Sequence, residues 1–308
     1  MTGGAGFIGS TLVDALLAAG HQVVVVDNLS TGSLANLENA ISHGSAFDFF
    51  EIDIRDDALA AVVTSRKPEI VFHLAAQISV TSSVKDPVTD ADVNIVGTLR
   101  LLQAASAAGV RKLLFATSAA IYGEVSESDL PIRESQPRRP VSPYGISKAV
   151  VLSYLEATSG QFGLAWSALA LANVYGPRQS SDGEAGVVAL FADHLRHDEQ
   201  PTIFGDGEQQ RDFLFVGDAV EAFVLAMNHG DGLVLNIGTG HGVSVNELWR
   251  ELADAARSDL APIYAPRREG DLQASRLDST LARSVLGWGA TTSLRAGLEQ
   301  LVEPSAES

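Results

Sequence analysis

Short apolar runs alternate along the first half of the chain with longer stretches in which apolar residues recur at helical spacing. The runs at 23–26, 47–53, 70–75, 112–118 and 166–172 predict strands, and the stretches at 12–17, 59–63, 88–108 and 144–162 predict helices. Pro68, Gly109 and Pro143 stand where helices should stop or start. Because strands alternate with helices, the sequence predicts an α/β fold with a Rossmann-type, doubly wound parallel sheet.

The pattern loosens in the second half of the chain. Residues 176–212 are rich in Gly, Pro and charge, which is typical of loops that hold a ligand. Later elements are a strand at 233–237, a helix opened by the capping box Ser244 to Glu247, and a last helix from about Ser293. We therefore predict a Rossmann domain over 1–172 and a smaller C-terminal substrate-binding lobe over 173–308, with residues 212–240 returning to the Rossmann domain.

One central strand is missing from this pattern. In a doubly wound fold an apolar strand leads into the first glycine-rich turn, but here Met1 and Thr2 stand directly before that turn. We expect that the chain starts late, as it would if a GTG valine codon were read as a start, so that Met1 takes the last position of the strand.

Composition and charge limit the partners. With 38 acidic and 21 basic residues, the formal net charge is −17, and such a field repels nucleic acid and anionic membranes. The absence of cysteine excludes disulfides and thiolate sites. Without a signal peptide or a long apolar run, a cytoplasmic location is expected. His194 and His197 could share a helix face, but no third ligand stands nearby, so no metal site is expected.

The glycine-rich turn predicts a dinucleotide site. Gly3, Gly6 and Gly9 have a spacing that lets the backbone approach a pyrophosphate at a helix N-terminus, where unpaired N–H groups and the positive end of the dipole favour an anion. Asp27 stands at the tip of the next strand, where a carboxylate accepts hydrogen bonds from ribose hydroxyls. Since Asp27 would repel a 2′-phosphate, the sequence favours NAD over NADP.

Tyr144 and Lys148 form the second candidate site. They stand four residues apart at a predicted helix start, so both side chains lie on one face. A neighbouring ammonium favours the phenolate, and lowering a phenol pKa from about 10 to neutrality takes about 4 kcal/mol. A coincidental pair on an amphipathic helix is the alternative.

With these elements placed, the chain resembles the extended short-chain dehydrogenase/reductase enzymes that act on nucleotide sugars, above all the UDP-hexose 4-epimerases. The resemblance spans nearly the whole chain and is carried by TGGAGFIGS, VVDNLSTG, HLAAQ, SAAIYG, YGISK, NVYGPR, IFGDGEQQRDF, NIGTG and RREGD. It implies reversible hydride transfer at C4 of the sugar through a 4-keto intermediate. Tyr144 would take the proton, Ser118 would hydrogen-bond the sugar oxygen, and Lys148 would lower the Tyr144 pKa and reach the nicotinamide ribose.

The resemblance also assigns binding residues. Those implied for the NAD cofactor are Gly3, Gly6, Phe7, Ile8, Gly9, Asp27, Asn28, Asp53, Ile54, Leu74, Ala75, Ala76, Asn94, Tyr144, Lys148 and Tyr175. Those implied for the UDP-sugar are Ser118, Tyr144, Asn173, Val187, Val188, Thr202, Phe204, Arg211, Arg268, Asp271 and Ser275. It further implies a homodimer in which the helices at 88–108 and from Tyr144 form a four-helix bundle, with apolar positions such as Leu99, Leu102 and Leu152 available for it.

Five other functions compete with C4 epimerisation of a UDP-hexose. Dehydratases and decarboxylases of this family need an extra acid beside the catalytic hydroxyl, but Ala119 and Ala120 follow Ser118. A UDP-glucuronate 4-epimerase comes second, although its relatives tend to carry Thr in place of Asn173. A reductase that stops after one hydride step and a non-catalytic NAD-binding module follow. The small Ser275 faces the C2 region of the sugar in this resemblance, so 2-acetamido sugars should also be accepted.

Overall fold

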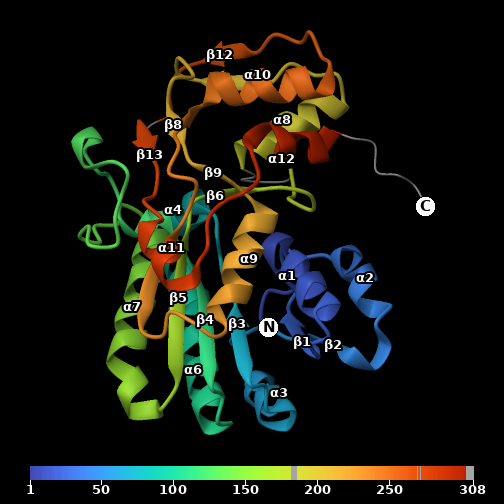
Figure 1. Ribbon diagram of the computed structural model, residues 1–308, viewed down its shortest axis with the longest axis vertical. Helices are drawn as coiled ribbons and strands as arrows, with labels where there is room; N and C mark the ends of the chain where they lie inside the picture. Colours follow the sequence, from blue (N-terminus) through green and yellow to red (C-terminus); the bar gives the residue numbers. More distant parts are fainter. Residues whose placement is uncertain (182–185, 269, 271, 303–308) are drawn as a thin grey trace.

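The computed structural model describes residues 1–181, 186–268, 270 and 272–302. A parallel sheet lies at the centre of the larger domain, with a smaller lobe beyond its upper edge in Figure 1. The sheet contains β1 (Val23–Asp27), β2 (Phe47–Glu51), β3 (Ile70–His73), β4 (Lys112–Ser118), β5 (Ala165–Leu171) and β10 (Leu233–Ile237). Strand order is β10-β5-β4-β3 in one part and β1-β2 in the other.

Met1 and Thr2 join the two parts of the sheet. Thr2 forms parallel bridges with Val26 on one side and with His73 on the other. The Thr2 N–H donates to the Phe72 carbonyl at 2.9 Å, and the Val26 N–H donates to the Met1 carbonyl at 2.8 Å. These two residues therefore occupy the place of the central strand that the pattern lacked.

Helices cover both faces of the sheet, as a doubly wound fold requires. One face carries α1 (Phe7–Ala18), α2 (Glu38–Ile41), α9 (Val216–Ala226) and α11 (Thr280–Leu286), whose apolar residues share one core cluster. The other face carries α3 (Ala58–Arg66), α6 (Thr98–Ala107) and α7 (Pro143–Phe162), which share a second. The expected Rossmann-type fold is confirmed.

After residue 212 the chain returns to the sheet domain with α9, β10 and α11. The helix α9 and the strand β10 fall within the stretch 212–240, and α11 lies outside it. The predicted domain boundaries as such stay a prediction.

The lobe has its own core. Its elements are α8 (Val187–Arg196), β7 (Thr202–Phe204), β8 (Gln210–Arg211), β11 (Val243–Ser244), α10 (Val245–Ala256), β12 (Ile263–Ala265), β13 (Ala274–Ser275) and α12 (Leu294–Val302). Phe191 and Trp249 meet edge to face in this core, with ring centroids 5.3 Å apart. The strands β6 (Asn173–Tyr175) and β9 (Phe213–Phe215) pair with each other where the chain passes between domain and lobe.

The long helix predicted over 88–108 is divided into three parts. They are α5 (Pro87–Ala91), a π-helical segment η3 (Asp92–Gly97) and α6, and α4 (Val80–Lys85) precedes them. A Cβ on Gly97 would lie 2.8 Å from the Ile54 side chain, so the glycine allows close packing on the residues after β2. A π turn widens the helix by one residue, which sequence periodicity does not show. Within the described residues, no helix is long and apolar enough to cross a membrane.

Candidate active site

The glycine-rich turn lies at the carboxyl end of the sheet, against the residues after β3. Gly3 has a φ of +72°, and a Cβ there would lie 2.5 Å from the Ala75 nitrogen. A Cβ on Gly9 would lie 2.0 Å from the Gly3 carbonyl oxygen. Only glycine fits at these two positions, and α1 begins without a side-chain cap, which leaves its first N–H groups available to an anion.

Asp27 ends β1 beside this turn. Its carboxylate is buried and accepts hydrogen bonds from the Ala5 and Leu29 N–H groups, both at 2.9 Å. The carboxylate thus fixes the turn while standing at the tip of the strand. Phe7 and Ile8 form the first turn of α1 and are partly buried. This cradle and its carboxylate fit the pyrophosphate and ribose of NAD.

Asp53 follows β2 and is held by a side chain that sequence reasoning missed. The Asp53 carboxylate accepts hydrogen bonds from Arg55 Nε at 2.9 Å and from Asn28 Nδ2 at 2.8 Å. The hydrogen bonds from Arg55 hold the Asp53 pKa well below its usual range. Arg55 also pairs with Asp92 at 3.1 Å. The charged triplet of Asp53, Arg55 and Asp92 fixes Asn28 and Asp53 as a pair, and Ile54, between Asp53 and Arg55 in sequence, is buried.

Asn94 lies in η3 with its amide fully engaged. Its Oδ1 accepts from the Gln77 N–H at 2.8 Å, and its Nδ2 donates to the Gln77 carbonyl at 2.9 Å. The same Nδ2 donates to Ser147 Oγ at 3.1 Å. Asn94 thereby holds the segment that begins with Leu74, Ala75 and Ala76, and its direct contact with the cofactor stays a prediction.

Ser118 and Tyr144 meet where β4 ends and α7 begins. Ser142 caps α7 by accepting from the Gly145 N–H at 3.2 Å, and a Cβ on Gly145 would lie 2.7 Å from the Ala120 carbonyl. The cap and the glycine let the helix start directly beside the strand end. Ser118, whose Oγ accepts a hydrogen bond from the Ala120 N–H at 3.2 Å, then lies close enough to Tyr144 to lower the pKa of its phenol.

The electrostatics of this pair differ from the sequence-based expectation. Burial raises the pKa of Tyr144 to about 12, although the nearby Ser118 hydroxyl acts in the opposite direction. Burial likewise lowers the pKa of Lys148 to about 8. Its ammonium donates to the Ala116 carbonyl at 2.9 Å and lies 4.7 Å from the centre of the Phe115 ring. The desolvation of both groups outweighs the attraction expected between the Tyr144 phenolate and the Lys148 ammonium. The protein groups alone therefore leave the phenol neutral at pH 7.

Most of the residues predicted for the substrate lie in the lobe. Ser275 and Arg211 stand opposite each other in the parallel pair β13–β8, so their side chains share one face. The Arg268 guanidinium lies 3.9 Å from the centre of the Phe204 ring. Thr202 begins the same strand β7 and is partly buried. Two cations and a small hydroxyl thus lie in the lobe, in or beside two separate sheets.

The remaining predicted substrate residues differ in their surroundings. Asn173 begins β6 and is exposed, as a ligand contact requires. Val187 is partly buried at the start of α8, but Val188 is 2% exposed and belongs to the lobe core. A helical period turns only one of two adjacent residues outward, and this assigns Val188 to packing. Asp271 lies outside the described residues.

Tyr175 is also buried in the lobe core. Its hydroxyl donates to the Leu294 carbonyl at 3.3 Å, and its ring meets Phe215 edge to face at 5.8 Å. Burial raises the pKa of this phenol further above its usual value. These contacts give Tyr175 a packing role, and its contact with the cofactor stays a prediction.

Asp212, between β8 and β9, was missed as an organiser of this region. Its buried carboxylate accepts from the N–H groups of Thr239, Gly240 and Leu277 at 2.8, 3.1 and 3.0 Å. It therefore ties the turn after β10 to the chain that follows β13. The signal was the charged pair Arg211-Asp212 directly before the apolar run from Phe213 to Val216.

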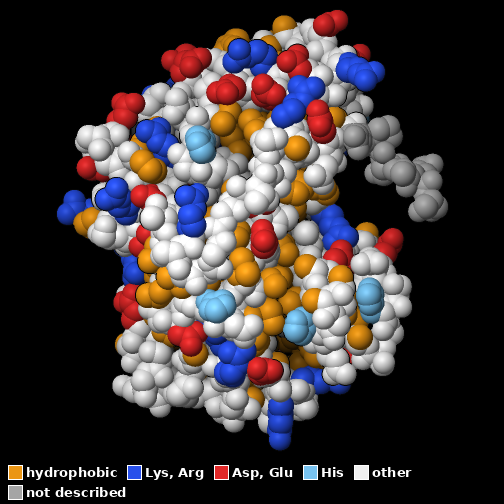
Figure 2. Space-filling model, viewed as in Figure 1, with side chains coloured by type: hydrophobic (Ala, Val, Ile, Leu, Met, Phe, Trp, Pro, Cys, Tyr) orange, Lys and Arg blue, Asp and Glu red, His pale blue; other side chains and the backbone are white. Residues whose placement is uncertain are grey.

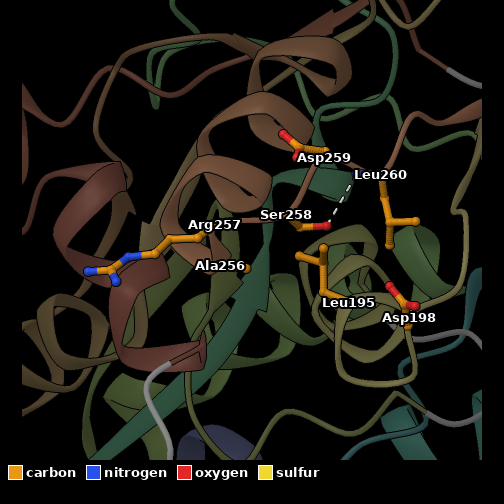
Figure 3. A pocket seen from close by; sticks show the side chains of 7 residues that line it. All are labelled: Leu195, Asp198, Ala256, Arg257, Ser258, Asp259 and Leu260. Atoms are coloured by element: carbon orange, nitrogen blue, oxygen red, sulfur yellow. Dashed lines mark hydrogen bonds between the residues drawn. The ribbon is translucent and has the colours of Figure 1, made fainter.

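A cavity of about 630 Å³ is lined by Thr239, Gly240 and Leu277, the residues that Asp212 holds. Another of about 500 Å³ lies between the ends of α8 and α10, where Leu195, Ser258 and Leu260 line it. Figure 3 shows the Arg257 side chain pointing away from it. On the face shown in Figure 2, acidic and basic side chains are interspersed, without a continuous basic patch.

The fold and site define a class: a Rossmann-type enzyme with a dinucleotide cradle and a Ser-Tyr-Lys centre facing a second lobe. The family model described as the NAD dependent epimerase/dehydratase family matches residues 1–238. The chain belongs to this family.

Three relatives refine the class. The chain is 47% identical over 305 residues to UDP-glucose 4-epimerase of Mycolicibacterium smegmatis, covering 98% of this chain and 96% of that protein. It superposes on UDP-glucose 4-epimerase of Thermotoga maritima, solved with UDP-glucose, with a TM-score of 0.94 and 46% identity, covering 98% and 96% of the two chains. It also superposes on UDP-N-acetylglucosamine 4-epimerase of Methanobrevibacter ruminantium, solved with UDP-N-acetylmuramic acid. The TM-score is 0.90 and the identity 33%, covering 98% of this chain and 96% of that chain. The expectation of an NAD-dependent nucleotide-sugar epimerase is confirmed.

Proposed function

We propose that this enzyme inverts C4 of a UDP-hexose, interconverting UDP-glucose and UDP-galactose. The observation that carries the proposal is the meeting of the end of β4, which carries Ser118, with the start of α7, which carries Tyr144 and Lys148. It stands at the sheet edge that also holds the glycine-rich cradle. The proposal further draws on similarity to UDP-glucose 4-epimerases over nearly the whole chain.

In the proposed mechanism, the protein moves one proton and holds two ligands. Tyr144 takes the proton of the 4-hydroxyl, and Ser118 hydrogen-bonds the oxygen where charge develops. NAD, held by the cradle at Gly3 and Gly9 and by Asp27, supplies the hydride acceptor when bound. Because burial raises the Tyr144 pKa to about 12, the phenolate needs further positive charge near it. Lys148 on the next turn of α7 does not by itself offset this burial, so the further charge would come with the bound cofactor, whose oxidised nicotinamide ring is cationic.

The lobe residues suit a nucleotide diphosphate. Arg211 and Arg268 are assigned to the two phosphates, which an acidic chain can hold only with placed cations. The hydrophobic face of Phe204 is assigned to the base, with Thr202 beside it. Since the sugar must turn over between the two hydride steps, firm binding of the nucleotide and loose binding of the sugar are required.

Breadth toward 2-acetamido sugars belongs to the same proposal. Ser275 shares a face with Arg211 and has a small side chain, which leaves room where a larger residue would exclude an acetamido group. A UDP-N-acetylglucosamine 4-epimerase is 33% identical to this chain. We therefore include UDP-GlcNAc and UDP-GalNAc among the substrates.

Two alternatives are tested together with the main proposal. The residues after Ser118 form the short helix η4 (Ala119–Ile121) and offer no carboxyl group, which argues against dehydration. A UDP-glucuronate 4-epimerase and a non-catalytic NAD-binding module differ in their products. The enzyme is incubated with NAD and either UDP-galactose or UDP-glucuronate, and the sugar released on hydrolysis is analysed. Glucose from UDP-galactose supports the proposal, and inversion of the uronate alone supports the first alternative. No inversion of either sugar supports the binding module.

We also propose that two copies pair through α4, α5, η3 and α7. These elements contact one another, and their outer faces carry exposed apolar side chains: Val84, Val88, Val96, Ile146 and Tyr154, all more than 40% exposed. Leu102 and Leu152, expected at such an interface, are 3% and 0% exposed and belong to the core of the sheet domain. Sedimentation of wild type and Ile146→Glu tests the pairing, and a monomeric wild type would contradict it. The cytoplasmic location stays a prediction.

A further inference from the structure

Asp90 is a buried acid that the mechanism above does not use. It lies in α5 and is 1% exposed. Its Oδ1 accepts hydrogen bonds from Gln77 Nε2 at 2.9 Å and from Asn94 Nδ2 at 3.1 Å. Within the part of the chain that the structure describes, no cation pairs with it at contact distance. Burying a carboxylate without an ion partner is costly, so the position calls for a compensating role.

The hydrogen bonds of Asp90 lead to the catalytic helix. Asn94 Nδ2 donates to Ser147 Oγ at 3.1 Å, and Ser147 Oγ donates to the Tyr144 carbonyl at 2.9 Å. In the other direction, Gln77 Nε2 also donates to the Ser79 carbonyl at 2.9 Å. One carboxyl group thus orients the segment after β3 and the start of α7 together.

The surroundings of Lys148 show why the acid lies there. From β4, the Ala116 carbonyl and the Phe115 ring face the ammonium. From β3, His73 is kept neutral because burial and the Lys148 charge lower its pKa to about 3. Tyr144 lies one turn earlier on the same helix. Asp90 is the acidic group that acts on Lys148, whose pKa it raises against the effect of burial, and it also raises the pKa of Tyr144.

We propose that Asp90 is a positioning residue for the epimerisation. Its carboxylate holds Gln77 and Asn94 beneath the catalytic helix, and its negative charge keeps the buried Lys148 charged. The proposal rests on the proposed function only in that the reaction uses Tyr144 and Lys148.

The first test is the pH profile of kcat/KM for UDP-galactose with NAD-loaded enzyme. Asp90→Asn keeps the shape of the side chain and removes its charge. Without that charge the phenolate of Tyr144 and the neutral amine of Lys148 are both favoured, so both limbs of the profile should move to lower pH, by about one unit. A purely structural role would lower the rate without moving the limbs. If both limbs of the Asp90→Asn profile lie at the same pH as those of wild type, the proposal is overturned.

The matched control is Asp86→Asn, in the same segment of chain. Asp86 is exposed and caps α5 by accepting from the Thr89 N–H at 3.0 Å, which an asparagine can also do. This variant makes the same charge change at the surface. Its profile should match wild type, and a shift equal to that of Asp90→Asn would show that net charge rather than position is responsible.

A second measurement covers the case in which Asp90→Asn folds poorly. Urea unfolding is compared for Asp90→Asn, Lys148→Met and the double variant. If the two buried charges compensate each other, the double variant is more stable than the two single losses predict. Additive losses, or a double variant that folds no better than Asp90→Asn, overturn the proposal. This cycle needs no turnover, so it remains decisive if the wild type proves inactive on UDP-galactose and the proposed function fails.

Discussion

His73 is a buried histidine that should make the protein sensitive to mild acid. It is 1% exposed at the end of β3, and its two ring nitrogens lie 2.7 Å from the hydroxyls of Thr2 and Thr98. Burial, with the nearby Lys148 charge, lowers its pKa to about 3. In the unfolded chain the pKa returns to about 6.5. The unfolded state therefore binds the proton first, and stability falls as the pH drops from about 6.5 toward 3.

The size of this effect follows from the two pKa values. Between pH 7 and pH 5 the folded histidine stays neutral while the unfolded one becomes almost fully charged. The free energy of unfolding should fall over this interval by about 2 kcal/mol on account of His73 alone. Other groups titrate in the same range, so the comparison must be made against a variant that lacks this one group.

His73→Gln provides that comparison, because an amide can still donate to one threonine and accept from the other. Urea unfolding of wild type and variant is measured at pH 7 and at pH 5. The variant is less stable at pH 7, but its loss on going to pH 5 should be smaller than that of wild type by about 2 kcal/mol. The control is His21→Gln, which makes the same substitution at an exposed position. Equal losses in wild type and His73→Gln would refute the reasoning.

Three further predictions concern catalysis and ligand binding. Tyr144→Phe should still bind NAD and UDP but lose more than 90% of turnover, which raises the barrier by roughly 1.4 kcal/mol or more. Lys148→Ala should lose turnover and also bind NAD more weakly. Stopped assays and NAD retention check both variants, and a Tyr144→Phe rate above a tenth of wild type would rule out Tyr144 as the base. Gly9→Ala places a Cβ 2.0 Å from a backbone carbonyl and should lose NAD on gel filtration, whereas Gly160→Ala, with open space, should not; equal retention would contradict the cradle. Ser275→Tyr should lose activity on UDP-GalNAc selectively, by roughly 10-fold or more in kcat/KM relative to UDP-galactose; a wild type inert on UDP-GalNAc would show that the pocket is closed elsewhere.

Sequence periodicity was sufficient for the elements that bury one regular face. The strand at 112–118 was predicted with the bounds of β4, and the helix from Tyr144 to about Phe162 agrees with α7. The predicted helix over 88–108 was wrong in its middle, where the π turn occurs and where Gly97 packs closely on Ile54, more than forty residues away in the chain. Periodicity carries no information on such contacts.

The sequence indicated which residues form the site, but it did not predict their pKa values. The spacing of Tyr144 and Lys148 placed them on one helix, yet both pKa shifts are dominated by burial, which the sequence does not state. Arg55 and Asp90 were missed for a related reason. Each acts on another polar side chain rather than on a ligand, and only the folded chain brings those side chains together.

The polar interior connects the two halves of the site. From Thr2 at the glycine-rich turn, hydrogen bonds run through His73 and Thr98 to the Asn94 carbonyl, the last at 2.6 Å. From the Asn94 side chain they continue through Ser147 to Tyr144. Because this series of hydrogen bonds runs through the interior, losing any one of them leaves an unsatisfied partner at a cost of about 1 to 3 kcal/mol. The cofactor cradle and the catalytic helix are therefore held in one relative position, which hydride transfer to either face of the same sugar requires.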